Sequence, residues 1–407
     1  MGTLERPIVV GGGAAGLAAC LTLESLGFAP LLLEASDRLG GRLRTERMED
    51  GTPVDHGFQI LLTAYPELQR WADIPALEPV AFVPGARIRS STRWKTVADP
   101  RRLPGSISAT LTSGIGSFRD RLRILRLVGE ACSGTPESVQ DGLTTGTTLE
   151  FLRARGFSEP FIAGFLRPFF SGIFLDAALS PPPAQFMYTL RMLANGCTVR
   201  PRHGIEALAT QLSGRLLRTE VRYGSEVRQM TADAVHLADG TEVRGAGVIS
   251  TIPSEESVSW NACLNVVFEC QAPTFGQPII GLIPGAECVT NLHFMEDVQG
   301  EEGKGKLNVT ALPPSAQGVD VEGLISSVRD ELKGSGLSIG SAKWHAMIPK
   351  ALPAMERVGT RPEQAVDGRG VFLAGDHVAA PSLDAALRSG RLAAEAWGAS
   401  KAEQDAG

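Results

Sequence analysis

The sequence predicts an α/β protein of more than one domain, and three observations lead to this prediction. The chain has 407 residues, whereas a single hydrophobic core stops growing near ~250–300 residues. Hydrophobic residues make up 43% of the chain and charged residues 21%, as in ordinary globular proteins. Short apolar runs at 8–10 and 30–33 flank a segment with helical spacing, which is the order of a strand–helix–strand unit.

Composition argues against several classes of protein. The net charge of −6 includes no long block of one sign, so we expect no nucleic-acid partner. The six cysteines form no C-x-x-C pair and have no histidine at metal-ligand spacing, which predicts buried, reduced thiols and no metal site. The first residues lack the pattern of a signal peptide and no apolar run reaches ~18 residues, which favours a cytoplasmic location. Nothing in the sequence indicates an oligomeric state.

The most specific motif opens the chain. Ile8-Val9-Val10 is closed by Gly11-Gly12-Gly13-Ala14-Ala15-Gly16, after which apolar residues recur with helical spacing. In such a strand–turn–helix the first glycine permits the tight turn, the second lets backbone N–H groups approach a pyrophosphate, and the last lets helix and strand pack closely. Glu34 ends the next apolar run 18 residues after Gly16, where a carboxylate accepts hydrogen bonds from a ribose. The motif predicts dinucleotide binding, and a glycine-rich structural turn is the alternative.

Two further segments point to the kind of dinucleotide through a resemblance. Gly40-Gly41-Arg42 follows Glu34 closely, and Gly375-Asp376 ends an apolar run before a predicted helix that begins near Ser382. With these motifs the sequence resembles the superfamily of amine oxidases, phytoene desaturases and protoporphyrinogen oxidases, which are FAD-dependent. The resemblance implies a Rossmann-like FAD-binding domain of the two-dinucleotide-binding flavoprotein type, with an inserted α+β substrate-binding cap domain. No cysteine follows Cys288, so a thioether link from a C-terminal cysteine is excluded and FAD is expected to be held non-covalently.

The resemblance also assigns segments and residues. The FAD-binding domain would comprise residues 1–75, 199–255 and 346–407, and the cap would comprise 76–198 and 256–345. The opening turn and Arg42 would hold the pyrophosphate, Glu34 the ribose, and Asp376 the ribityl side of FAD. The full set of predicted FAD contacts is Gly11, Gly13, Ala14, Ala15, Gly16, Glu34, Ala35, Gly40, Gly41, Arg42, Gly57, Phe58, Val227, Thr251, Gly375, Asp376, Ser382, Leu383 and Ala385.

The expected chemistry needs few catalytic side chains. A flavin accepts hydride itself, so the protein mainly has to hold a C–H bond near it and exclude water. We therefore expect hydride abstraction from a C–C or C–N bond of a small, largely apolar organic substrate. The catalytic candidates are His56, Gln59, Trp344 and Lys350, with His203 as a further position. Taken singly, each of these is more often structural than catalytic.

Two absences weigh against an amine or amino-acid oxidase that produces hydrogen peroxide. In many of the resembling amine oxidases a lysine lies in the strand after the Thr-x-Pro exit, whereas residues 261–268 contain none. No aromatic residue lies between His345 and Gly370, where such enzymes place aromatic side chains around the flavin. Both absences favour dehydrogenation at carbon. A redox-neutral flavoprotein, either an isomerase or a protein with structural FAD, is the third alternative.

Two predictions concern local structure. Residues 117–132 place four arginines beside apolar residues at helical spacing, which is typical of an exposed helix of the cap, although a basic amphipathic helix can also dock on a membrane surface. Membrane association is therefore not our expectation. Residues 222–227 and 234–241 are expected to form two strands closed by the Asp239-Gly240 turn.

Overall fold

A five-stranded parallel sheet forms the centre of one lobe of the computed structural model, which describes residues 6–90, 93–99, 101–106, 113–136, 138, 145–253, 258–315, 318–354 and 366–406. Its strand order is β10-β2-β1-β14-β20. The bounds are β1 Ile8–Val10, β2 Leu31–Leu33, β10 Glu220–Arg222, β14 Val248–Ser250 and β20 Phe372–Leu373. All four pairings are parallel, with Val9 between Leu32 and Ile249. The sheet thus joins segments from the beginning, middle and end of the chain.

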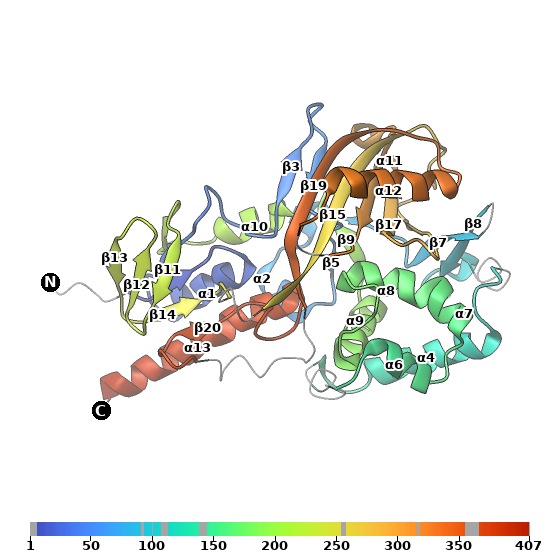
Figure 1. Ribbon diagram of the computed structural model, residues 1–407. Coiled ribbons are helices and arrows are strands. Elements are labelled where there is room, and N and C mark those ends of the chain that lie inside the picture. The colour runs from blue at the N-terminus through green and yellow to red at the C-terminus, as the bar shows by residue number, and fades with distance from the viewer. Residues whose placement is uncertain are drawn as a thin grey trace.

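Helices cover one face of this sheet, and a small sheet covers the other. Helix α1 (Ala14–Ser25) packs against α13 (Leu383–Ala406), and α10 (Glu206–Ser213) lies beside them (Figure 1). A Cβ at Gly390 of α13 would lie 2.0 Å from the Ala15 carbonyl oxygen, so the two helix backbones touch. On the opposite face, Val235 packs with Ile8, Leu31 and Val248. Val235 belongs to an antiparallel sheet of β11 (Val227–Met230), β12 (Ala234–Leu237) and β13 (Glu242–Arg244).

The prediction of two strands closed by Asp239-Gly240 is wrong in its pairing. The turn joins β12 to β13, and Gly240 has φ 88° there. Residues 222–227 do not form one strand, because Gly224, with φ 64°, separates β10 of the parallel sheet from β11 of the small sheet. A positive φ favours glycine and breaks an extended run.

The second lobe is built on a seven-stranded mixed sheet of order β19-β15-β18-β17-β16-β7-β8. Helix α12 (Val321–Gly334) packs on one face of it through Leu324, Ile325 and Val328. Helices α4, α8 and α9 lie on the other side (Figure 1), where α8 contacts β17. The strand bounds are β7 Gly85–Ser90, β8 Arg93–Ala98, β15 Ser259–Cys270, β16 Ile280–Leu282, β17 Val289–Phe294, β18 Lys306–Ala311 and β19 Ile339–Ala354. The helices are α4 Phe118–Cys132, α6 Thr148–Ala154, α7 Glu159–Phe161, the π-helical η3 Ile162–Leu166, α8 Arg167–Phe174 and α9 Pro183–Asn195.

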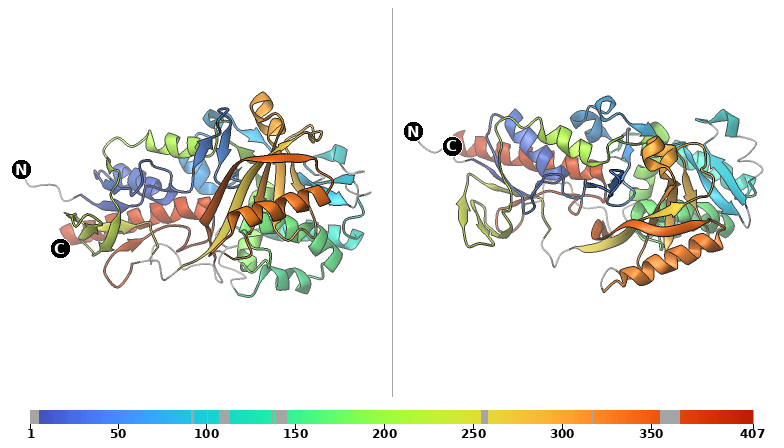
Figure 2. Two further views of the ribbon diagram at one scale, coloured as in Figure 1. Left: turned by 45° about the horizontal axis from the view of Figure 1, so that its top comes forward. Right: turned by 90° about the horizontal axis from the view of Figure 1, so that it is seen from above.

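Short elements connect the lobes. A hairpin of β3 (Thr45–Arg47) and β4 (Pro53–Asp55) rises beside β19 (Figure 1). A three-stranded sheet orders β5-β9-β6, from Leu61–Leu62, Thr198–Arg200 and Val80–Ala81. The remaining elements are α2 Pro66–Trp71, η1 Pro75–Leu77, η2 Pro104–Ser106, α11 Met295–Gln299 and η4 Gly300–Gly303. Both turned views show the two lobes side by side along one axis (Figure 2).

The predicted α/β fold class is confirmed. The assignment of segments to domains stays a prediction, and β19 runs through the expected boundary at 345/346 without a break. Helix α4 is exposed as expected, and Phe118, Leu122 and Leu125 are among its exposed side chains. All six cysteines are free, but Cys132 and Cys288 are half-buried and Cys197 is exposed, so the prediction that all are buried is wrong. Among the described helices, none combines the length and apolar character that crossing a bilayer requires.

Candidate cofactor and active site

The turn between β1 and α1 is packed tightly on one side and open on the other. A Cβ added to Gly11, whose φ is 95°, would lie 2.5 Å from Thr251 Oγ1 at the end of β14. A Cβ at Gly16 would lie 1.9 Å from the Gly11 carbonyl oxygen, so α1 can begin this close to β1 only with glycine there. At Gly13 an added Cβ would meet no described atom within 4 Å. The first turn of α1, with Ala14 and Ala15, therefore offers N–H groups next to open space, which suits an anion.

Glu34 and the second glycine pair are attached to this turn. Glu34 accepts hydrogen bonds from the Gly12 N–H at 2.7 Å through Oε2 and from the Ser36 N–H at 2.8 Å through Oε1. The Gly40 N–H donates to the Gly12 carbonyl at 2.8 Å, and a Cβ at Gly41 would lie 3.2 Å from Gly13 Cα. Each carboxylate oxygen of Glu34 keeps further acceptor capacity. The structure thus brings the predicted ribose and pyrophosphate residues into one cluster, while Ala35 is exposed beside them.

Arg42 joins the two ends of the chain. Its guanidinium pairs with Asp376 across 334 residues, with NH2 at 2.5 Å from Oδ1 and NH1 at 2.8 Å from Oδ2. The Asp376 side chain is buried, follows Gly375 at φ 122°, and lies beyond β20. Burial alone would lower the pKa of Arg42, but attraction and hydrogen bonding from Asp376 outweigh it and raise the pKa. The sequence assigned these residues to different parts of FAD and gave no sign that they pair with each other.

The beginning of α13 adjoins a buried polar network that the sequence did not indicate. Ser382 Oγ accepts a hydrogen bond from the Ala385 N–H at 3.1 Å and so caps the helix next to Leu383. Asp384 accepts from the Tyr188 hydroxyl at 2.5 Å and from the Glu67 N–H at 2.8 Å. Burial raises the pKa of Asp384.

A neighbouring amide and ion pair belong to the same region. Gln185 of α9 donates to the Pro381 carbonyl at 3.3 Å, and its buried Oε1 has no partner among the described residues. Arg391 of α13 pairs with Glu67 at 2.6 Å. The sequence contains no signal for these contacts, because α2, α9 and α13 are far apart in the chain.

Two of the catalytic candidates meet at a residue that the sequence analysis missed. His56 Nε2 lies 2.9 Å from Glu46 Oε1, and Trp344 Nε1 donates to Glu46 Oε2 at 3.3 Å. The His56 and Trp344 rings contact edge to face at 5.8 Å between centroids. Burial would raise the pKa of Glu46, but its hydrogen bonds to His56 and Trp344 lower it overall. The other candidates, Lys350 on β19 and His203, are exposed.

The loop after β4 is fixed at both ends. Gln59 Nε2 donates to the carbonyls of Arg42 at 2.6 Å and His56 at 2.9 Å. At the start of the loop, buried Asp55 accepts from Arg200 Nε at 2.8 Å, from the Ile205 N–H at 2.9 Å and from Thr45 Oγ1 at 2.7 Å. Gly57, with φ 93°, turns the chain between these anchors.

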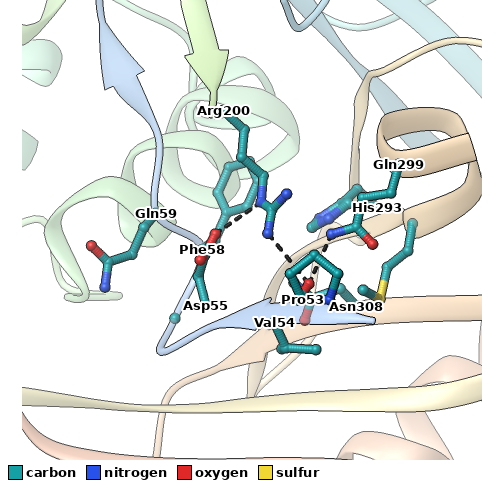
Figure 3. Close-up of a pocket in the computed structure, with 11 residues that line it drawn as sticks. Pro53, Val54, Asp55, Phe58, Gln59, Arg200, His293, Gln299 and Asn308 are labelled. Carbon is teal, nitrogen blue, oxygen red and sulfur yellow. Dashed lines mark hydrogen bonds and ion pairs between the residues drawn. The ribbon is translucent and has the colours of Figure 1, made fainter. Parts of the chain in front are cut away.

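A pocket lies between this loop and the seven-stranded sheet (Figure 3). Phe58 and Gln59 line it from the loop, Arg200 from β9, and His293 and Asn308 from β17 and β18. Burial and the nearby Arg200 charge lower the pKa of His293 to about 3, so this imidazole is neutral at ordinary pH. The last predicted contact, Val227, packs against the core formed by β1 and β2.

The fold is that of an α/β protein in which strand, glycine turn, helix and acidic residue stand in the arrangement that dinucleotide-binding sites use. Comparison with known proteins makes the class specific. The sequence model of the flavin containing amine oxidoreductase family matches residues 14–295. The chain belongs to that family, whose cofactor is a flavin.

Similar proteins include both desaturases and oxidases. A 15-cis-phytoene desaturase of Arabidopsis thaliana is 42% identical over 64 residues, which are 16% of this chain and 11% of the relative. Protoporphyrinogen oxidase 2 of the same plant is 29% identical over 168 residues, 41% of this chain and 32% of the relative. The chain thus spans at most about a third of these relatives.

Solved structures match over nearly the whole chain. A putative protoporphyrinogen oxidase from an Exiguobacterium species superposes with a TM-score of 0.69 at 18% identity, over 98% of this chain and 99% of that one. A putrescine oxidase double mutant gives 0.67 at 14% identity, over 97% and 99%. A fatty acid isomerase of P. acnes gives 0.71 at 15% identity, over 95% and 97%. At such identities the superpositions establish the fold.

Proposed function

We propose that the protein binds FAD non-covalently and abstracts a hydride from a C–C or C–N bond of a small, largely apolar organic substrate. The observation that carries the proposal is the junction of the opening glycine turn with the Gly375-Asp376 segment. The turn follows β1 and the Gly375-Asp376 segment follows β20, and these two strands flank β14 in one parallel sheet. Arg42, whose segment is bonded to the turn through Gly40, pairs with Asp376. Strands of a parallel sheet present their carboxyl ends at one edge, where dinucleotides bind.

The residues present fit this cofactor. The open space at Gly13 lies beside the N–H groups of α1, which suit a pyrophosphate, and Glu34 has acceptor capacity left for ribose hydroxyls. Gln185 Oε1 is buried near the start of α13 and has no partner in the described part of the chain, so it suits an N–H donor of a ligand. Arg42 and Asp376 supply one cation and one anion at the junction. Bound FAD would supply the hydride acceptor at this place.

The chain itself positions the substrate and keeps water out. Phe58 packs edge to face on Phe82 at 5.5 Å and tilts against His293 at 5.2 Å. Glu46 of β3 holds His56, which follows β4, and Trp344 of β19 in fixed orientations. We assign His56 and Trp344 to the wall of the substrate site, and the catalytic parts of Gln59 and Lys350 stay predictions, as does that of His203. The expectations of a cytoplasmic location, of no nucleic-acid partner and of no membrane partner stay predictions.

A redox-neutral reaction is the second candidate, because the fold also occurs in a fatty acid isomerase and in a UDP-galactopyranose mutase. An amine oxidase is the third, although β15 lacks the lysine expected for it. Anaerobic mixing of the purified protein with a panel of alkyl compounds that carry an alcohol, amide, amine or alkene group distinguishes the three candidate reactions. Bleaching of the flavin by a non-amine supports dehydrogenation. Bleaching by amines alone, with hydrogen peroxide on admission of air, would favour the oxidase, and turnover without bleaching would favour the isomerase.

A further inference from the structure

On the face of the seven-stranded sheet that is turned away from α12, the central strands carry buried polar side chains. In β18, Leu307, Val309 and Ala311 pack in the core with α12. The alternate residues Asn308 and Thr310 therefore point to the opposite face. Asn265 of β15 and His293 of β17 are buried polar side chains on the paired strands, and His293 stands opposite Asn308 in the register. Apolar side chains would be more favourable at these positions, because burying a polar group without a hydrogen-bond partner costs about 1–3 kcal/mol of folding free energy.

Three side chains of the Figure 3 pocket have hydrogen-bonding capacity that no described residue uses. Gln299 Nε2 donates to the Pro53 carbonyl at 2.9 Å, which fixes the orientation of the amide and leaves its Oε1 buried without a partner. Asn308 Oδ1 is buried as well, and neither oxygen has a partner among the residues that the structure describes. The His293 imidazole makes ring contacts with Phe58 and Phe82 rather than hydrogen bonds within the described part of the chain. Buried polar groups are normally satisfied, so these three point to an occupant.

The charges around the pocket define the chemistry of that occupant. The Arg200 guanidinium is neutralised by Asp55 at 2.8 Å, and both side chains are about 5% exposed or less. A cation would face Arg200 at short range, and an anion would face the carbonyl oxygens of Gln299, Asn308 and Pro53. A bound ion of either sign would lose its hydration shell without gaining an oppositely charged partner in the pocket. An uncharged group that donates a hydrogen bond meets neither penalty.

We propose that the pocket lined by Gln299, Asn308 and His293 is a subsite for an uncharged hydrogen-bond donor of the substrate, a hydroxyl or a carboxamide. This assignment rests on the proposed function, because Gly57, Phe58 and Gln59 line the same pocket and form the loop expected beside FAD. A largely apolar substrate would thus carry one neutral polar group, placed at a fixed distance from the reacting bond. An ordered water that only completes the fold is the competing occupant.

The test uses four probes that share one alkyl chain: 1-hexanol, hexanamide, hexylammonium and hexanoate. Their dissociation constants are measured by calorimetry on the full chain, and flavin difference spectra are recorded in parallel. The alcohol or the amide should bind at least about tenfold more tightly than either ion. Asn308→Leu should weaken that binding about threefold to tenfold, the worth of one hydrogen bond. Its melting temperature should stay equal or rise, because the replaced carbonyl oxygen has no partner within the described ranges to lose.

Asn291→Leu is the matched control. Asn291 is a buried carboxamide of β17 whose Oδ1 also has no partner among the described residues, but it does not line the pocket. Its probe affinities should stay at the wild-type value. Should Asn308→Leu fail to fold, Gln299→Met removes the other acceptor and should give the same loss of affinity.

Three results would overturn the assignment. They are tightest binding of an ion, equal loss of affinity in Asn291→Leu, and a lower melting temperature of Asn308→Leu with unchanged probe binding, which is the signature of a structural water. Calorimetry does not depend on a flavin signal, so it tests the assignment of the subsite even if the protein retains no FAD. Absence of FAD would instead refute the proposed function.

Discussion

Gly13→Ala separates what the cofactor requires from what the fold requires. Gly13 caps α1 with φ −76° and ψ −174°, a conformation that alanine also adopts, and an added Cβ meets no described atom within 4 Å. Alanine is a poorer cap than glycine by about 0.5–1 kcal/mol, whereas it reduces the entropy of the unfolded chain by about 0.4–1 kcal/mol. These terms nearly cancel. The melting temperature of the apoprotein should therefore change by less than about 2 °C.

The same methyl group should interfere strongly with FAD. It would stand where the N–H groups of the turn are expected to meet the pyrophosphate. Losing one hydrogen bond to a charged group costs about 1.5–3 kcal/mol, which corresponds to about 10- to 150-fold weaker binding. Titration of the apoprotein with FAD, followed by quenching of flavin fluorescence, measures this change. Wild-type affinity in Gly13→Ala would refute the placement of the pyrophosphate.

Gly16→Ala is the matched control on the same turn. Its Cβ would lie 1.9 Å from the Gly11 carbonyl oxygen, so backbone must move before the fold can form. We expect its melting temperature to fall by several degrees, in contrast to Gly13→Ala. A Gly16→Ala protein as stable as wild type would show that the close packing of α1 on β1 is wrong.

The remaining predictions concern Glu34, His293 and Tyr188. Glu34→Ala should purify with less FAD than wild type because the ribose acceptor is lost, and full flavin content in released-cofactor assays would contradict the assignment. His293 has a folded pKa of about 3, below its unfolded value of 6.5. Only the unfolded chain is protonated between these values, so stability is lost as pH falls from 6.5 towards 3, by about 1.4 kcal/mol per pH unit. The denaturation free energy of His293→Phe should depend less on pH between 6 and 4, as measured in urea, and an unchanged slope would refute the burial argument. Tyr188→Phe removes the hydroxyl that donates to Asp384 and should lower the free energy of unfolding by about 1–3 kcal/mol, whereas Tyr223→Phe, at an exposed position, should change it little.

Local sequence was sufficient to predict the elements that form the proposed cofactor site. The glycine turn at 11–16 and the Gly375-Asp376 segment are short patterns whose backbone requirements are visible in the residues themselves. The structure places them at the ends of β1 and β20, on either side of β14, and Thr251 Oγ1 at the end of β14 donates to the Gly11 carbonyl at 3.2 Å. Helix α1 was equally visible, since almost all of its residues are apolar and buried.

Long-range polar pairs were not predictable. Arg42 with Asp376, Arg200 with Asp55, and Glu46 with Trp344 each join side chains more than 140 positions apart. Each of these residues has an ordinary local context, so no periodicity or spacing identifies its partner.

The error in the prediction around Asp239-Gly240 has a different cause. The local turn signal was correct, but the choice of strands on either side depended on Gly224, which sends β10 and β11 into different sheets.

The cofactor content of the purified 407-residue chain decides whether the protein holds FAD non-covalently. We expect a preparation with the visible spectrum of an oxidised flavin, from which denaturation by heat or acid releases stoichiometric FAD. We also expect that the chain, once stripped of its cofactor, regains that spectrum when FAD is added. A colourless protein that stays empty in excess FAD, or a flavin that remains attached after denaturation, would contradict it.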